Sequence, residues 1–134
     1  MGDFFKLFPQ KAIIGMIHLA GDDRDERVKR ALEETTIFEE EGLQGIIIED
    51  YHGTPEDVIN AMRDIKKRRT RLIVGINILA HPYLSFGLAD KYGAKFVQFD
   101  TVQSPTLDSI AYDSLRKNFP NIVVLGGIRF KYTN

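Results

Sequence analysis

The chain has 134 residues, 43% of them hydrophobic, and its 18 basic side chains nearly balance 19 acidic ones. This size and composition fit one compact domain, residues 1–134, with a core of its own, and the order of strands and helices described below assigns it to the α/β class. The near-neutral charge argues against a nucleic-acid partner, and the lack of cysteine excludes disulfides, thiolate metal sites and a cysteine nucleophile. The longest apolar run, Ala12–Ala20, is too short to span a membrane. We therefore expect no membrane insertion and a cytoplasmic location.

Five short apolar runs, each bounded by turn residues, predict β-strands. The segments between them show the 3.6-residue period of amphipathic helices. Alternation of strand and helix with short connections predicts right-handed βαβ units and a parallel sheet. The predicted strands are Ala12–His18, Gly45–Asp50, Leu72–Ile78, Phe96–Thr101 and Ile122–Gly126.

The first two intervening segments carry clear helix signals. Acidic residues crowd the first turn of the first helix, where they suit the positive end of the helix dipole, and Gly42 ends that helix. The second helix begins with Thr54 as N-cap, Pro55 at its first position and Asp57 three residues after the cap. The predicted buried residues are Val28, Ala31, Leu32, Thr35 and Phe38 in the first helix and Val58, Ala61, Met62 and Ile65 in the second.

The remaining helices have weaker signals. The second helix closes with the basic quartet 66–69, which we interpret as a solvated helix end rather than a nucleic-acid site. The third helix is predicted from near Pro82 to Gly93. The fourth has Pro105 near its start and is expected to bury Ile110, Ala111 and Leu115.

Two architectures fit this order of elements: an open, doubly wound parallel sheet, or part of a (β/α)₈ TIM barrel. In a barrel, alternate strand residues face the helices and the barrel interior, whereas a doubly wound sheet is covered by helices on both faces. Gln98 favours the barrel, because an amide in mid-strand is hard to bury beneath a helix. A complete barrel takes about 250 residues. We therefore expect half to five-eighths of a barrel, the N-terminal part of a longer protein.

The interior-facing residue at the end of each of the first four predicted strands is polar. Catalytic residues of (β/α)₈ enzymes lie at this rim, so we predict Glu49, Asp100 and His18 as proton-transferring catalytic residues. Amide and glycine N–H groups can orient substrate oxygens. We accordingly predict that substrate contacts Asn77, Asp50, Gln98, Gly126 and Gly127.

Structural roles compete with these functional ones. The ring of His18 can be satisfied by a backbone carbonyl, Glu49 and Asp50 can cap the following turn, and Asn77 can lock a loop. His52 and His81 are interpreted as loop residues. A metal site made of His18, Glu49 and Asp100 is chemically feasible, but no HxH or HExxH spacing supports it, so we predict no metal site. The sequence indicates no particular cofactor.

Three glycine-led segments resemble the opening of the BtpA family, TIM-barrel proteins named after a cyanobacterial photosystem I biogenesis factor. They are Gly15–Leu19, Gly45–Asp50 and Gly75–Leu79, and the likeness covers roughly the first hundred residues. The resemblance implies that His18, Glu49 and Asn77 are the polar strand ends of the family. The sequence differs from the pattern of that family in three places, so the resemblance does not identify a substrate. Ala20–Asp23 replaces a proline-rich loop, Asp50 replaces an asparagine, and Ala80–Pro82 replaces a polar run.

These observations predict an enzyme of the TIM-barrel type acting on a small polar metabolite, phosphorylated or not. The alternative is a non-catalytic assembly or biogenesis factor, as the name of the resembling family implies. A sheet of five strands cannot close into a barrel, so for a chain of only 134 residues we expect an open inner face. Such a chain should either self-associate and bury this face or be poorly stable and prone to aggregate. The side chains expected to face water there are Ile14, Met16, Ile47, Ile73 and Phe96.

Overall fold

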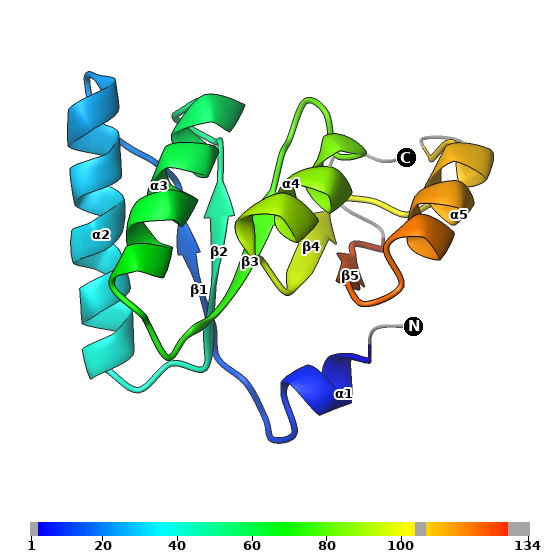
Figure 1. The fold of residues 1–134 in the computed structure, drawn as a ribbon, viewed down its shortest axis with the longest axis horizontal. Helices are drawn as coiled ribbons and strands as arrows, with labels where there is room; N and C mark the ends of the chain where they lie inside the picture. Colours follow the sequence, from blue (N-terminus) through cyan, green and yellow to red (C-terminus); the bar gives the residue numbers. More distant parts are fainter. Residues whose placement is uncertain (1–2, 104–106, 129–134) are drawn as a thin grey trace.

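The structure, a computed structural model, describes residues 3–103 and 107–128 of the chain (Figure 1). Short strands alternate with helices along the sequence, as predicted, and each strand lies inside the range expected for it. The elements are α1 (Phe4–Leu7), β1 (Ile14–Ile17), α2 (Arg24–Glu40), β2 (Gly45–Glu49), α3 (Pro55–Lys67), β3 (Ile73–Asn77), α4 (Leu84–Tyr92), β4 (Phe96–Phe99), α5 (Ser109–Asn118) and β5 (Val123–Gly126).

The five strands form one all-parallel sheet in the order β1-β2-β3-β4-β5. Each strand pairs with the next strand in the sequence, so the chain advances in one direction across the sheet. The register places Glu49 at the end of β2 directly beside Asn77 at the end of β3. This order brings the polar strand ends of neighbouring strands to one edge of the sheet, as expected for part of a barrel wall.

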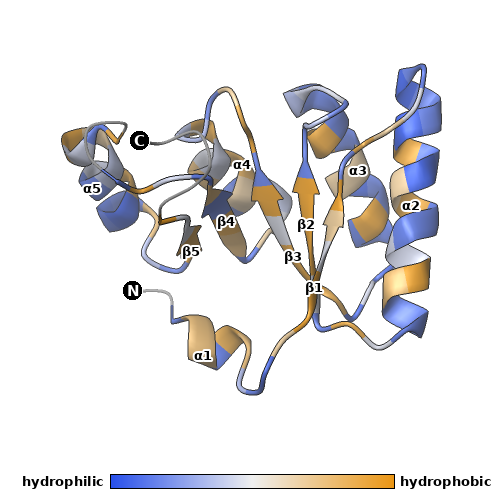
Figure 2. Ribbon diagram, turned by 180° about the vertical axis from the view of Figure 1, so that it is seen from behind, coloured by the Kyte–Doolittle hydropathy of each residue, from blue (hydrophilic) through white to orange (hydrophobic). Residues whose placement is uncertain are grey.

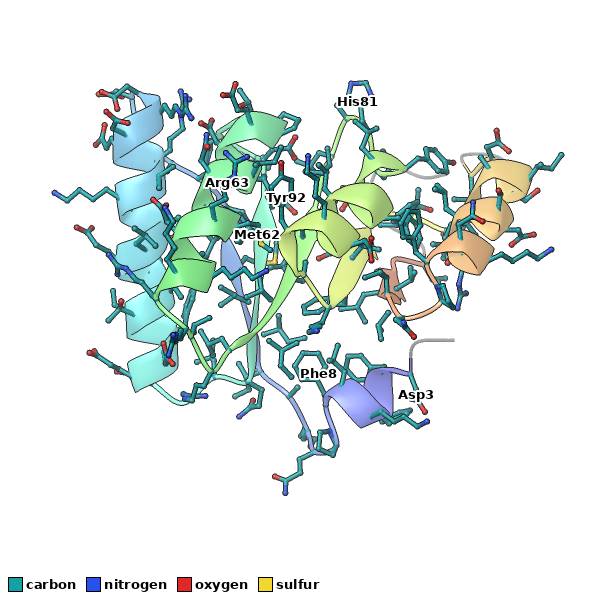
Figure 3. All side chains as sticks on the ribbon, in the orientation of Figure 1. Asp3, Phe8, Met62, Arg63, His81 and Tyr92 are labelled. Atoms are coloured by element: carbon teal, nitrogen blue, oxygen red, sulfur yellow. The ribbon has the colours of Figure 1, made fainter. Side chains whose placement is uncertain are left out.

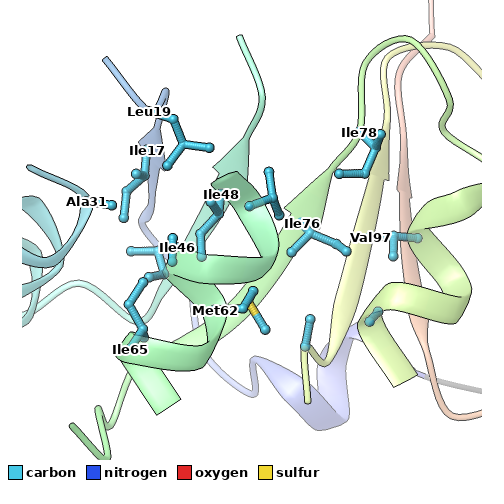
Figure 4. Packing of buried hydrophobic residues seen from close by; sticks show 14 of the residues in the cluster. Ile17, Leu19, Ala31, Ile46, Ile48, Met62, Ile65, Ile76, Ile78 and Val97 are labelled. Atoms are coloured by element: carbon cyan, nitrogen blue, oxygen red, sulfur yellow. The ribbon is translucent and has the colours of Figure 1, made fainter. Parts of the chain in front are cut away.

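Helices α2 to α5 pack on one face of this sheet (Figures 1 and 2). Figure 4 shows Ile46, Ile48 and Ile76 projecting toward α3, where Met62 and Ile65 meet them. The predicted buried stripe of α3 is confirmed, because Val58, Ala61, Met62 and Ile65 are all buried. The one-sided placement of these four helices matches a barrel wall, since a doubly wound sheet distributes its helices over both faces.

The opposite face carries a second, smaller apolar cluster around Phe8, Ile47, Phe96 and Val123. The short helix α1, which the sequence signals did not reveal, supplies Phe4 and Leu7 to this cluster, and Phe8 follows directly as its C-cap. The Phe8 and Phe96 rings meet edge to face with centroids 5.6 Å apart. The expectation that Ile47 and Phe96 face water is therefore wrong: they are 4% and 0% exposed. The other three, Ile14, Met16 and Ile73, are half-buried beside the same cluster.

Helix boundaries differ from the prediction mainly in α4 and α5. Helix α4 begins at Leu84, two residues after Pro82, and has the predicted Gly93 as its C-cap. Helix α5 begins at Ser109, where the Asp108 carboxylate accepts the Ala111 N–H. Pro105 lies outside the described residues. Ile110, in the first turn of α5, is 83% exposed, so its predicted burial is wrong. Ala111 and Leu115, also predicted as buried, are half-buried, and Leu115 packs against the core. No helix in the described part of the chain is both long and apolar enough to cross a membrane.

Candidate functional site

Two carboxylates and an amide meet at the C-terminal edge of the sheet. The Asn77 side chain at the end of β3 donates from Nδ2 to Glu49 Oε2 at 2.9 Å and to Asp100 Oδ1 at 3.0 Å. Because both oxygens contact one nitrogen, they lie within about 6 Å of each other. Three of the predicted site residues, from β2, β3 and the residue that follows β4, are thus brought into one hydrogen-bonded group.

Glu49 is the most buried carboxylate of this group. The residue is 7% exposed and Asn77 is 1% exposed, while Asp100 is half-buried. Burial raises the pKa of Glu49, and the neighbouring charges of Asp100 and Asp50 raise it further. The charge of His18 and the hydrogen bond from Asn77 act in the opposite direction but do not cancel the burial. A carboxyl group with a raised pKa suits general acid–base chemistry.

His18 lies on the solvent side of Glu49. Its Nε2 is 3.8 Å from Glu49 Oε1, and its side chain is 47% exposed. Two aromatic residues of the β2–α3 loop adjoin it: the ring centroids of Tyr51 and His52 are 5.3 Å and 6.3 Å from that of His18. The His52 N–H also donates to the His18 carbonyl at 3.0 Å, which ties the two loops together. Sequence reasoning missed Tyr51 and took His52 for a loop residue only.

Asp50 and Gly127 form hydrogen bonds that stabilise the loops at the C-terminal ends of the strands. The Asp50 carboxylate accepts the Leu79 N–H at 2.8 Å, so it locks the loop after β3 rather than its own turn. The Gly127 N–H donates to the Phe99 carbonyl at 2.9 Å, so it is already used within the fold. A Cβ at Gly127 would lie 1.9 Å from the Asp100 carbonyl oxygen. Only glycine permits this close approach, which gives Gly127 a structural role beside the predicted one.

The remaining predicted residues lie around the group. Gln98 is half-buried on β4, paired with Leu125 of β5. Gly126 ends β5, and a Cβ there would approach Val102 at 2.7 Å. His81 is exposed in the loop before α4, at the outer edge of the molecule in Figure 3.

A small cavity of about 130 Å³ adjoins the hydrogen-bonded group. The Tyr83 and Phe99 rings form part of its wall and meet edge to face at 5.7 Å, and the Tyr83 hydroxyl accepts the Asp108 N–H at 2.8 Å. A space of this size admits a small molecule or one end of a larger one. Its lining residues are Asn77, Leu79, Pro82, Tyr83, Phe99, Asp100, Thr101 and Leu107.

A buried ion pair supports the loops that carry His18 and His52. Arg27 Nη1 of α2 lies 3.1 Å from Asp57 Oδ2, and Asp57 is 3% exposed. The same carboxylate accepts the Thr54 N–H at 2.9 Å, which completes the predicted capping box of α3. Arg27 also donates from Nε to the Gly21 carbonyl at 3.1 Å. The loop after β1 is thereby joined to the start of α3.

Nothing in residues 3–103 and 107–128 groups three His, Asp or Glu side chains so that they could hold a metal ion. At the C-terminal ends of the strands, the Asn77 amide joins Glu49 and Asp100 through two hydrogen bonds. The arrangement can hold a proton, accept hydrogen bonds and present negative charge to a ligand.

The chain is similar to an uncharacterized protein of Pyrococcus furiosus. The two are 26% identical over 113 residues, a match that covers 71% of this chain and 43% of the relative. The chain thus spans less than half the length of that protein. No protein-family model matches the sequence, and no solved structure matches it.

Proposed function

We propose that the chain belongs to an enzyme of the TIM-barrel type in which Glu49 transfers a proton to or from a small polar metabolite. The observation that carries the proposal is the buried Glu49 carboxyl joined through the Asn77 amide to Asp100. Active sites of (β/α)₈ enzymes lie at the C-terminal ends of the strands, where these three residues lie. The resemblance to the BtpA family is part of the same proposal.

Each residue has a distinct role in this chemistry. The raised pKa of Glu49 lets the carboxyl group hold a proton closer to neutral pH than an exposed glutamate does. Asp100 presents a second acidic group that stabilises positive charge as it develops on the substrate. Asn77 fixes the orientation of both carboxylates. His18, which is half-exposed beside Glu49, is the group that exchanges protons between Glu49 and solvent.

The size of the adjoining cavity favours a small substrate. About 130 Å³ accommodates a few non-hydrogen atoms, and polar Asn77, Asp100 and Thr101 share its wall with apolar and aromatic side chains. That the substrate carries a phosphoryl group rests only on analogy with other TIM barrels. Their common phosphate site follows strands seven and eight, whereas the structure here describes five strands.

A metabolite screen tests the proposal. Thermal unfolding of the wild-type chain is measured with each compound of a library of small polar metabolites. A compound at 100 times its Kd should stabilise the fold by about 2.7 kcal/mol. Asp100→Asn should weaken that shift, because Asp100 lines the cavity. If no compound stabilises the protein, the rival function, a non-catalytic assembly factor, replaces the enzyme.

Turnover of a compound found in this way distinguishes catalysis from binding. Glu49→Gln keeps an oxygen that accepts from Asn77 but cannot transfer a proton, so we expect kcat to fall by about 10²-fold or more. Product formation is followed by NMR, and the exposed Glu40→Gln variant at the end of α2 is the matched control. Equal turnover in Glu49→Gln and Glu40→Gln would assign Glu49 a structural role.

A further inference from the structure

A pocket of about 300 Å³ lies between α3 and α4, at the opposite end of the sheet from Glu49. Figure 1 shows the two helices side by side across β3, and Figure 3 labels Met62, Arg63 and Tyr92 in the space between them. The volume is at the lower end of the range of small-molecule sites. The lining residues are Met62, Ile65, Lys66, Arg69, Thr70, Leu72, Ile73, Val74, Tyr92, Gly93 and Lys95.

The walls of this pocket are mostly apolar. Met62 and Ile65 come from α3, Val74 from β3 and Tyr92 from the end of α4. Arg63 connects the two helices beside the pocket: its Nη2 is 3.4 Å from the Tyr92 hydroxyl, and its guanidinium carbon is 5.2 Å from the ring centroid. The ring of Tyr92 is thereby held between α3 and α4, and the pocket has a fixed wall on that side.

Three exposed cations surround the apolar interior: Lys66, Arg69 and Lys95. No carboxylate lines the pocket, and among the described residues none of the three cations forms an ion pair. The Lys66 ammonium lies over the end of α4, 3.2 Å from the place of a Cβ at Gly93. Lys66 and Arg69 suit the negative C-terminal end of α3, and Lys95 lies two residues after Gly93, the C-cap of α4, directly before β4.

We propose that this pocket binds a small organic anion with an apolar body, of the chemical class of a medium-chain alkyl carboxylate. Apolar walls accommodate the body, and three cations without acidic partners attract the charge. The proposal is independent of the chemistry at Glu49, because the pocket and the strand ends share no lining residue.

Methionine methyl groups provide the test. The chain contains three methionines, of which Met62 lines the pocket and Met16 lies on the inner face of the sheet. The chain is labelled with ¹³C at the methionine methyl carbon and titrated with octanoate. We expect the Met62 signal to shift in a saturable way while the Met16 signal stays in place. A Met62 signal that does not move at millimolar octanoate would overturn the proposal.

Three further probes separate charge from apolar binding. Octanol lacks the charge, octylammonium reverses it, and acetate lacks the apolar body. We expect each to bind at least about tenfold more weakly than octanoate, since each removes one of the two complementary features. Octanol or octylammonium binding as tightly as octanoate would contradict a role for the cations.

Charge-reversal variants locate the anion. Lys66→Glu and Lys95→Glu should each weaken octanoate binding about tenfold, and Lys66→Met, which keeps the apolar stem, should weaken it less.

Lys67→Glu is the matched control. It changes the net charge equally, but Lys67 does not line the pocket and pairs with Asp64 at 3.8 Å. It should bind octanoate as wild type does. Equal weakening by Lys67→Glu would mean general electrostatic attraction and no site between α3 and α4. Circular dichroism melts of each variant check that it is folded.

Discussion

The burial of Glu49 links the chemistry of the site to the stability of the fold. The ordinary pKa of the group is 4.5, and the folded chain raises it. Between these two values the unfolded chain has lost the proton while the folded chain keeps it. Stability contributed by protonated Glu49 is therefore fully present below pH 4.5 and is lost as the pH rises through the folded pKa.

The Glu49→Gln variant should not lose stability as the pH rises, because its side chain has no proton to release. Glutamine stays neutral and still accepts from Asn77, so we expect the variant to gain stability over wild type as the pH rises from about 4.5 to 7. Urea unfolding midpoints at several pH values measure the difference. Glu40→Gln, at an exposed position, should show no such trend. Parallel pH profiles for wild type and Glu49→Gln would contradict the raised pKa.

At the scale of residues, the alternation of strand side chains was predictable and the contacts between loops were not. The period of two in β2 and β3 placed Glu49 and Asn77 on the inner face, and the structure has them there in register. Asp50 and Gly127 have partners in other segments, Leu79 and Phe99, which no local pattern reveals. Their structural tasks depend on how neighbouring loops approach.

At the scale of elements, helix caps predicted boundaries where a side chain makes the cap. Thr54 and Asp57 in α3 were evident from the sequence, and both hydrogen bonds of the capping box are present. Helix α1 has four residues, too few for a periodic signal, and its N-cap Asp3 is not followed by a helical stripe. Its position depends on the contact of Phe8 with the sheet, which is tertiary.

The Arg27–Asp57 pair is the element-scale contact whose loss we expect to matter most to the loops of the site. Asp57→Ala removes the capping box and leaves Arg27 unpaired at a site where its side chain is only 23% exposed. We expect a loss of about 2–3 kcal/mol in the free energy of unfolding. Urea titration measures it.

Asp108→Ala is the matched control, because Asp108 caps α5 at an exposed position without an ion pair in the described structure. Its expected cost is about 1 kcal/mol. If both variants lose the same free energy, Arg27 contributes nothing beyond the cap. Arg27→Met in the Asp57→Ala background should recover part of the loss, since the unpaired charge is then gone.

At the scale of the whole molecule, four helices cover one face of the sheet, and within the described residues α1 and the adjoining Phe8 cover part of the other. The sequence predicted this asymmetry through Gln98 and the polar strand ends. It did not predict how far α1 and the adjoining Phe8 cover Ile47 and Phe96. The expected exposure of the inner face is therefore reduced to three half-buried residues: Ile14 and Met16 of the edge strand β1 and Ile73 of the central strand β3.

The two edge strands of the sheet, β1 and β5, favour self-association of the chain. Within the described residues β1 and β5 each pair with one strand only, and Ile13 before β1 is 66% exposed. Unpaired strand edges recruit other strands, and apolar side chains beside them strengthen the contact. We expect the 134-residue chain to sediment at micromolar concentration as an oligomer heavier than its 15.3 kDa monomer. Ile13→Lys should shift it toward the monomer, because a charge beside an edge strand opposes pairing. Ile37→Lys, at a position 54% exposed on α2, should leave the sedimentation of the chain unchanged. A wild-type monomer with a cooperative melt would mean that α1 and the edge residues already protect the sheet.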